Sequence, residues 1–135
     1  AGGSGFGLLS FCGASIRPGF QIVAEILKLD AAMSEADLVI TGEGRLDAQT
    51  LEGKAPAGVA ALAREHHKPV IAFCGAVRDE PRLAKHFDAI CPIANRAMPI
   101  EKALADAAVL LEQRAAQTAR SFAAGELFTA PNKAR

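Results

Sequence analysis

The sequence lacks several features that would place it in a specialised class of protein. It has no Trp and no Tyr, so only seven Phe are aromatic and the core must consist mainly of Ala, Leu, Val and Ile. Fifteen Lys and Arg balance fifteen Asp and Glu. This zero net charge gives no electrostatic reason to expect binding to nucleic acid or to an anionic membrane surface. Because no apolar run approaches the roughly 18–20 residues that span a bilayer, we also expect no membrane segment, and we recognise no secretory leader.

Cysteine is sparse as well, with three residues that are far apart and form no CxxC pair. This count and spacing exclude a disulfide framework and a zinc site. Cys12, Cys74 and Cys91 stand among apolar neighbours, so we expect buried free thiols that behave as small hydrophobic side chains. Free thiols are typical of a reducing compartment, and we therefore predict a cytoplasmic location.

The composition that is present is that of a globular domain. Half of the residues are hydrophobic and 22% are charged. The 135 residues are enough for one domain with a useful core. The sequence starts with a glycine-rich stretch, AGGSGFG, and without Met. Because a domain rarely starts inside such a stretch, we expect the chain to be a piece of a longer protein.

The apolar pattern predicts helices that alternate with three short strands. Apolar runs bounded by turn residues indicate strands at 37–40, 69–74 and 89–93. Helical spacing indicates helices at about 5–14, 18–27, 31–35, 56–67, 82–86 and 100–124. This order is typical of an α/β, Rossmann-like fold with a parallel sheet and helices on both faces. Doubly wound sheets have about five or six strands, so we expect this sheet to be incomplete.

The helix ends and faces give more detailed expectations. We expect Asp30 to cap the turn at 31–35, Pro18 and Pro56 to begin their helices, and Gly125 to end the last one. The glycines near the start of the chain suit close helix packing. The apolar face expected on the last helix consists of Leu104, Ala108, Leu111, Ala115, Ala119 and Phe122.

Ligands of open parallel sheets bind outside the carboxyl ends of the strands. Three predicted loops lie there, at 41–45, 75–78 and 94–96. The first is the richest in polar side chains and continues as Thr41-Gly42-Glu43-Gly44-Arg45-Leu46-Asp47-Ala48-Gln49-Thr50, then Gly53-Lys54 ahead of Pro56. Its glycines allow a ligand to approach the backbone closely.

The charged residues of this segment suit an anionic substrate. Arg45 presents a planar fork to phosphate or carboxylate, and Lys54 is a point charge near a helix start. Glu43 and Asp47 can bind Mg²⁺ or accept a hydroxyl proton. Structural roles stay open beside these: Asp47 as the cap of the turn at 48–51, a solvated Glu43–Arg45 pair, and Gly53 as a chain reversal. The third glycine of a dinucleotide fingerprint is missing.

The joined blocks TGEGR-x-D at 41–47 and GK-x-P at 53–56 resemble the signature of the bacterial glycerate kinases of the glycerate 2-kinase type. Further similarity covers roughly residues 1–93. The resemblance implies an ATP- and Mg²⁺-dependent transfer of a phosphoryl group to D-glycerate by a two-domain enzyme of nearly three times this length. By this analogy the chain is a C-terminal fragment, in which 1–35 ends an inserted second domain and 36–135 belongs to the Rossmann-like domain. Two glycine-bearing blocks of the family, DSFK-like and GGSATNDGG-like, have no counterpart here, so the missing N-terminal portion is an expected partner.

The site expected from the segment and the resemblance has three parts. Glu43, Arg45 and Asp47 are the candidate catalytic residues, and Asp47 is the candidate Mg²⁺ ligand. The candidate substrate- and phosphate-binding residues are Thr41, Gly42, Gly44, Gln49, Thr50 and Lys54. Two other interpretations remain, a non-catalytic fragment that keeps the family fold and a Rossmann-like module that binds a nucleotide or a small acid.

Overall fold

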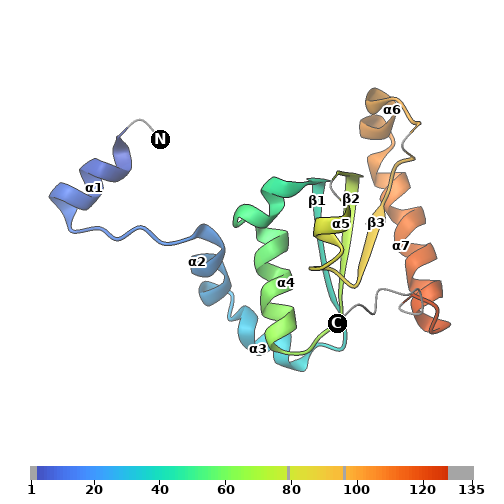
Figure 1. Cartoon of the computed structure of the whole chain (residues 1–135), viewed down its shortest axis with the longest axis horizontal. Coiled ribbons are helices and arrows are strands. Elements are labelled where there is room, and N and C mark those ends of the chain that lie inside the picture. Colours follow the sequence, from blue (N-terminus) through green and yellow to red (C-terminus); the bar gives the residue numbers. More distant parts are fainter. Residues whose placement is uncertain (1–2, 79, 96, 128–135) are drawn as a thin grey trace.

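The computed structural model describes residues 3–78, 80–95 and 97–127. Strands and short helices alternate along most of the chain, as Figure 1 shows. The elements are α1 (Ser4–Cys12), α2 (Gly19–Ile26), α3 (Leu29–Glu35), β1 (Val39–Leu46), the 3₁₀ helix η1 (Ala48–Glu52), α4 (Ala55–Glu65), β2 (Val70–Val77), α5 (Glu80–Leu83), β3 (Ala89–Pro92), α6 (Ile100–Ala105) and α7 (Ala107–Ala123).

The described strands form one parallel sheet in the order β1-β2-β3. Val39 is in register with Val70, and Ala72 with Ile90. Helices cover parts of both faces, so the predicted α/β fold is confirmed. Within the described residues, no helix combines the length and the apolar character needed to cross a membrane.

One face of the sheet, called the first face here, carries the main hydrophobic core. Val39, Val70, Ala72 and Cys74 point to this face and pack in a single buried cluster. The helices and the turn after α5 contribute the other members that pack over these strands, among them Met33, Ala60, Ala63, Leu83 and Phe87. Phe20 of α2 lies against α4, where a Cβ on Gly58 would clash with its ring. The first face is therefore closed by α3, α4 and α5.

The opposite face, called the second face, is packed by α7. Ile71 and Cys91 are buried here but do not belong to the first-face cluster. The Thr118 hydroxyl of α7 lies 3.6 Å from the Cys91 sulfur and donates a hydrogen bond to it. The expected burial is thus confirmed for Cys74 and Cys91, whereas Cys12 is exposed, on a helix with no buried residue.

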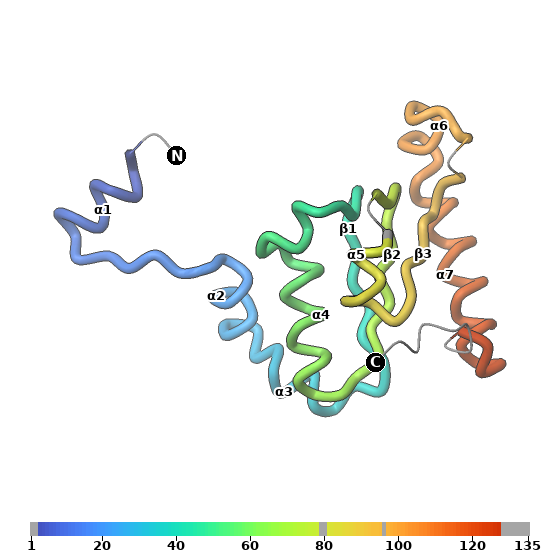
Figure 2. Tube along the Cα trace, in the orientation of Figure 1, coloured from blue at the N-terminus to red at the C-terminus, as the bar shows by residue number. Residues whose placement is uncertain are grey.

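The N-terminal segment extends away from the sheet, as the chain trace shows (Figure 2). None of the residues of α1 or α2 is buried. A Cβ on Gly5 would meet Ile16 Cδ1 at 3.6 Å, an ordinary contact, and one on Gly7 would meet nothing within 4 Å, so neither glycine lies in the close helix packing that was expected. Gly2, part of the same run, lies outside the described residues.

Several predicted helix boundaries need correction. Pro18 and Lys54 are N-cap residues, Pro56 follows inside the first turn, and α5 starts two residues before the predicted 82–86. The N-cap of α3 is Lys28 in a left-handed conformation (φ 52°), so Asp30 lies inside the first turn. There its carboxylate is 2.7 Å from His66 Nε2, which explains its position without a capping role.

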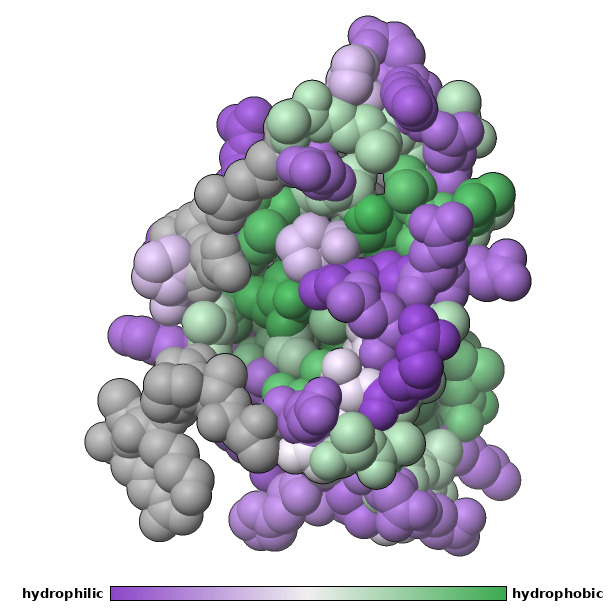
Figure 3. Space-filling model, turned by 90° about the vertical axis from the view of Figure 1, so that its right-hand side faces the viewer, coloured by the Kyte–Doolittle hydropathy of each residue, from purple (hydrophilic) through white to green (hydrophobic). Residues whose placement is uncertain are grey.

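The predicted final helix is two helices, and its inward face is displaced by one residue. The helix breaks at Asp106, which ends α6 and caps α7. Leu104, Leu111 and Phe122 of the predicted apolar face are exposed. The buried and half-buried residues of these helices are instead Ala103, Ala107, Leu110, Arg114, Thr118 and Ser121, together with Asp106 and with Ala115, the one half-buried member of the predicted face. The prediction failed because the buried row of side chains includes polar residues such as Arg114 and Thr118, whereas the neighbouring row is apolar and yet mostly exposed. Figure 3 shows the side of the molecule on which α6 and α7 lie, with apolar and hydrophilic residues interleaved on its surface.

Two helices end in the same hydrogen-bonded arrangement. At the end of α7, Gly125 (φ 73°) donates to Phe122 and Glu126 donates to Ser121, as in a Schellman motif. The prediction that Gly125 ends this helix is confirmed. At the end of α4, His67 (φ 55°) takes the position that glycine occupies in α7, with its N–H on the Arg64 carbonyl.

Candidate functional site

The predicted site does not lie on a loop but on the second half of β1. Thr41–Arg45 was expected to form a loop, yet β1 continues to Leu46 and stays paired with β2, which continues to Val77. The second predicted loop is corrected in the same way, since only Arg78 of 75–78 follows the strand. Glycine usually ends a strand, but here the neighbouring strand satisfies the backbone hydrogen bonds throughout. A Cβ on Gly75 would lie 2.6 Å from the Gly44 carbonyl oxygen, so this close strand approach requires glycine.

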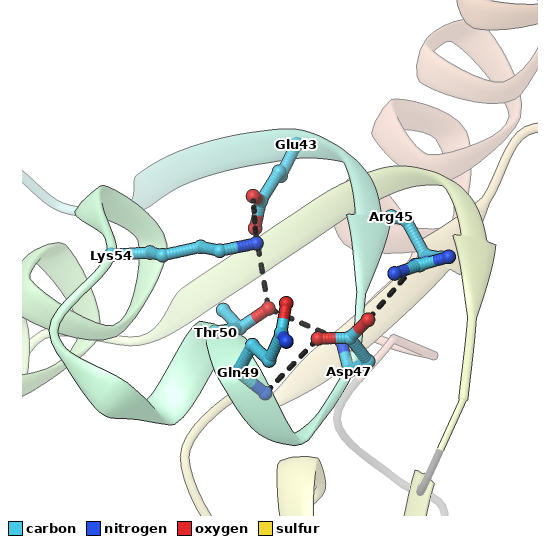
Figure 4. A network of polar contacts seen from close by, with 6 residues as sticks. All are labelled: Glu43, Arg45, Asp47, Gln49, Thr50 and Lys54. Carbon is cyan, nitrogen blue, oxygen red and sulfur yellow. Dashed lines mark hydrogen bonds and ion pairs between the residues drawn. The ribbon is translucent and has the colours of Figure 1, made fainter.

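The strand, η1 and the start of α4 bring six of the predicted residues together: Glu43, Arg45, Asp47, Gln49, Thr50 and Lys54 (Figure 4). Because side chains alternate along a strand, Thr41 and Glu43 point to one face, whereas Gly42 and Gly44 point to the other. A Cβ on Gly42 would meet the Phe73 carbonyl at 3.0 Å, while one on Gly44 would meet nothing within 4 Å. The structure thus separates the two glycines from the six clustered side chains.

Glu43 is the centre of the first half of the cluster. Its Oε1 accepts a hydrogen bond from Lys54 Nζ at 2.9 Å, and its Oε2 accepts one from Thr50 Oγ1 at 3.2 Å. Thr50 is fully buried (0% exposed), so within this fold its hydroxyl positions Glu43. The considered Glu43–Arg45 pair is not formed, because Lys54 is the cation that folds back over Glu43.

Asp47 is the centre of the second half. Its Oδ1 accepts the Gln49 N–H at 3.0 Å, and its own N–H donates to Thr50 Oγ1 at 3.1 Å, which makes a capping box at the start of η1. The capping role considered from the sequence is confirmed. Gly53, which ends η1 with φ 100°, also makes the considered chain reversal. Arg45 Nε donates to Asp47 Oδ2 at 2.8 Å.

These contacts set the charge of Asp47. Burial acts to raise the pKa of the carboxyl, but the hydrogen bonds from Gln49 N–H and Arg45 and the charges of Arg45 and Lys54 outweigh it. The pKa of Asp47 is therefore below its ordinary value of 3.8. Such a carboxylate stays ionised at neutral pH, and it is a poor proton acceptor because an effective general base has a pKa near the working pH.

The two cations are more accessible than the carboxylates that they neutralise. The side chains of Arg45 and Lys54 are 56% and 41% exposed, against 14% for Asp47 and 24% for Glu43. Ion pairs near the surface hold their partners weakly, at about 0–1 kcal/mol. An anion that binds at the end of β1 can therefore take Arg45 or Lys54 from its carboxylate partner, which leaves an oxygen of Asp47 or Glu43 without that partner.

Mg²⁺ is the ion that the carboxylates of this cluster would suit. Mg²⁺ is commonly bound by one or two carboxylates, with water and substrate phosphates as the other ligands. Glu43 and Asp47 supply such a pair, and no group of three or more His, Cys, Asp or Glu gathers within the described ranges. The donor set is compatible with an ion that arrives with a phosphate substrate.

The sequence patterns missed one polar group near the same edge of the sheet. Arg114 faces inward from α7 beside the end of β3, and its Nε atom is buried with no hydrogen-bond partner in the described structure. The sequence pattern did not reveal Arg114, because it assigned the wrong row of α7 residues to the core and because an arginine in an amphipathic helix is normally assigned to the solvent-exposed face. Of the third predicted loop, Ala94 and Asn95 lie here, while Arg96 is outside the described residues.

Known proteins resemble nearly the whole chain. It is 42% identical to the glycerate kinase of Bacillus subtilis (strain 168) over 124 residues, which are 90% of this chain and 32% of that protein. It is 46% identical to the glycerate 2-kinase of Escherichia coli (strain K12) over 80 residues, or 59% of this chain and 21% of the relative. The solved structure of a protein described as a glycerate kinase 2 from Salmonella typhimurium LT2 matches with a TM-score of 0.72 and 42% identity, over 93% of this chain and 32% of that one.

The chain thus spans about a third of the length of the Bacillus and Salmonella proteins. The sequence model of the glycerate kinase family matches residues 1–123, which include every residue of the polar cluster at the end of β1. The chain belongs to the glycerate kinase family.

Proposed function

We propose that this chain is the C-terminal part of an enzyme that transfers the terminal phosphoryl group of ATP to a hydroxyl group of D-glycerate. The observation that carries the proposal is the cluster of Glu43, Arg45, Asp47 and Lys54 at the carboxyl end of β1, in a chain of the glycerate kinase family. Relatives named glycerate kinase support the activity.

In this proposal Arg45 and Lys54 bind the anionic parts of the substrates. Phosphoryl transfer depends mainly on positioning and on neutralising charge. The planar Arg45 guanidinium suits two oxygens of a carboxylate or phosphate, and Lys54 suits a single oxygen. Thr41 and Gln49 complete the proposed binding surface. Gly42 and Gly44 point to the opposite face of β1, so their proposed contribution is through backbone groups, and nothing lies within 4 Å of the Gly44 Cβ position to keep a substrate from that backbone.

The two carboxylates have different proposed roles. The lowered pKa of Asp47 suits a permanently ionised metal ligand, so Asp47 would hold Mg²⁺. When bound, Mg²⁺ neutralises phosphate charge. Glu43 would accept the proton of the attacking hydroxyl once Lys54 has moved to the substrate, since its Oε1 is then free. Thr50 keeps Glu43 in place from the buried side.

The complete site needs more chain than these 135 residues. We propose that residues 1–35 end an inserted domain, that 36–135 belong to the Rossmann-like domain, and that the preceding part of the enzyme is the partner that supplies the rest of the site. The exposed apolar side chains of α1 and α2, including Phe6, Phe11 and Ile26, are consistent with such a partner. We also retain the prediction of a cytoplasmic location.

The test is a kinase assay that measures ADP formation with D-glycerate, ATP and Mg²⁺ in a full-length parent that carries this sequence. We expect Arg45→Ala and Asp47→Asn each to lower kcat/KM at least ten-fold, which is about 1.4 kcal/mol. Asparagine is as good an N-cap as aspartate, so Asp47→Asn removes the charge and leaves η1 capped. Arg17→Ala is the matched control, since Arg17 pairs with the exposed Glu25 far from the cluster along the chain.

Near-parental activity of both variants would refute the site. The 135-residue chain assayed alone separates a self-sufficient enzyme from a part of one. We expect no ADP formation above background from the chain alone, and its activity at the parental rate would refute the requirement for the preceding part.

A further inference from the structure

A second polar site lies two strands away from the cluster on β1. A cavity of about 350 Å³ lies between the carboxyl end of β3 and the middle of α7. Ile93 and Leu110 form part of its apolar wall, and Asn95, Gln113, Arg114 and Gln117 supply its polar side chains. None of the proposed catalytic residues lines it.

Two of the amide side chains that line this cavity, Asn95 and Gln117, have an oxygen that already accepts a hydrogen bond. The Asn95 side-chain oxygen already accepts the Ala97 N–H at 3.0 Å, and the Gln117 side-chain oxygen accepts Arg114 Nη1 at 3.0 Å. A backbone N–H and a guanidinium can only donate, so these partners fix which end of each amide is the oxygen. The amide nitrogens of Asn95 and Gln117 are therefore the ends left for a ligand.

Arg114 adds a positive charge, and among residues 3–78, 80–95 and 97–127 it forms no ion pair. Its Nε atom is buried and has no hydrogen-bond partner in the described structure. None of the lining residues is acidic, and the ion pairs found among the described residues do not include Arg114. The guanidinium is half-buried, is held by Gln117 through Nη1 and lines the cavity, so it favours a ligand that accepts hydrogen bonds and carries negative charge.

The position in the fold supports a binding site. The helices that follow β1 and β2 cover the first face of the sheet, whereas α7, which follows β3, packs on the second face. The cavity lies beside the carboxyl end of β3. In open α/β sheets, ligands bind outside the carboxyl ends of the strands.

From these observations we infer that the cavity between β3 and α7 is an oxyanion site, in which Arg114 and the amide groups of Asn95 and Gln117 bind a phosphate or carboxylate group of a small molecule. The site requires no chemistry step and no metal. It is separate from the kinase proposal in its residues and in its test.

The identity of the anion rests on the proposed function. Glu43 is in register with Cys74, and Cys74 with Pro92, so the two sites lie at the same level of the sheet, but Glu43 points to the first face and α7 packs on the second. The proposed substrates of the kinase carry phosphate groups or a carboxylate, and either oxyanion suits these donors. A phosphate group, which has more oxygens and more negative charge, is the expected occupant, with a carboxylate as the alternative source.

The experiment is an NMR titration of the 15N-labelled 135-residue chain with inorganic phosphate and, separately, with D-glycerate. We expect phosphate to shift the side-chain amide signals of Asn95 and Gln117 and the Arg114 Nε–H signal. We expect Arg114→Met to weaken phosphate binding at least ten-fold. Arg120→Met is the matched control, because Arg120 lies on the same helix, is exposed and does not line the cavity.

A second variant keeps the test valid if Arg114→Met does not fold. Gln117→Glu keeps the size of the side chain and places a negative charge beside Arg114, so it should also abolish binding while the amide spectrum stays dispersed. Shifts with D-glycerate alone would assign the site to a carboxylate. Absence of shifts at Asn95 and Gln117 with both probes at about 10 mM, or equal binding by Arg114→Met, would overturn the inference without bearing on the kinase assay.

Discussion

The two faces of the sheet are covered to very different extents. On the first face, α3, α4 and α5 bury a contiguous cluster, in which Leu83 and Ala72 are 0% exposed. On the second face, α7 packs against β3, but Ile40 of β1 is 61% exposed. Its register partner Ile71 on the next strand is only 1% exposed. The cover of the second face therefore ends between β2 and β1.

This comparison explains why an ordinary globular composition gives an incompletely buried chain. Large apolar side chains remain exposed on α1, α2, α6 and α7 as well as at Ile40. An apolar strand at the edge of a sheet invites association with other chains. The exposed faces agree with the proposed need for a preceding part of the enzyme, since relatives are about three times as long.

The largest expected effect comes from removing a core side chain on the closed side. Leu46→Ala should lower the free energy of unfolding by about 2–5 kcal/mol, because Leu46 is fully buried in the main hydrophobic cluster. Ile40→Ala in the same strand is the matched control and should change it by less than about 0.5 kcal/mol. Urea unfolding followed by circular dichroism measures both. Equal losses of unfolding free energy would mean that Ile40 is covered in solution, which would contradict the difference in cover between the two faces.

A smaller effect is expected where the strands approach most closely. Gly75→Ala should destabilise by about 1–3 kcal/mol, because its Cβ would lie 2.6 Å from the Gly44 carbonyl oxygen. Gly44→Ala should leave stability nearly unchanged, since nothing lies within 4 Å of its Cβ position. Thermal unfolding of the two variants tests this difference. A lower kcat/KM of a stable Gly44→Ala parent enzyme would support substrate contact at Gly44, and a destabilised Gly44→Ala would contradict the open space.

A stabilising change is expected at the end of α4. A non-glycine residue in the left-handed region costs roughly 1–2 kcal/mol, and glycine loses roughly 0.5–1 kcal/mol more backbone entropy on folding. His67→Gly should therefore raise the free energy of unfolding by about 0.5 kcal/mol. Gly125→Ala, at the equivalent position after α7, should lower it. The same urea experiment measures both, and a stabilising Gly125→Ala would refute the interpretation of these helix ends.

The smallest effect concerns pH at the rim of the first face. Burial, followed by the charges of Arg64 and Lys85, lowers the pKa of His86 below its ordinary value of 6.5. As pH falls below 6.5, the unfolded chain binds a proton that the folded chain does not, so stability decreases until the folded-state pKa is passed. His86→Gln should remove this part of the acid loss, roughly a few tenths of a kcal/mol because solvent screens a partly exposed group. An unchanged pH profile between about pH 5 and 7 would contradict the shift.

The sequence predicted the positions of the strands better than it predicted their lengths. The β-branched runs near Val39 and Val70 are enough to predict parallel strands, because such side chains fit a sheet buried on both faces. The continuation of β1 through Gly42 and Gly44 could not be predicted, since glycine is a poor strand former by itself. The length of the paired strand β2 overrides that preference.

Most hydrogen-bond and ion-pair partners within the candidate site could not be predicted from the sequence either. The Asp47 cap followed from local spacing, because a cap involves residues only two or three positions apart. The pairing of Glu43 with Lys54 joins residues eleven positions apart and depends on the path of η1 between them. The role of Arg114 depends on which side chains of α7 pack against the sheet, and the packing of α7 on β3 determines which ones do.

By itself, the sequence determined the α/β class, the position of the polar segment near the end of the first strand and the end of α7 at Gly125, and it offered the Asp47 cap as one of several roles. These features depend on periodicity and on interactions between near neighbours, which a linear pattern contains. Only the tertiary structure decided the length of β1, the ion-pair partners, the inward face of α7 and the unequal cover of the two sheet faces. Each of these depends on a segment distant in the chain, whose packing outweighs local preference.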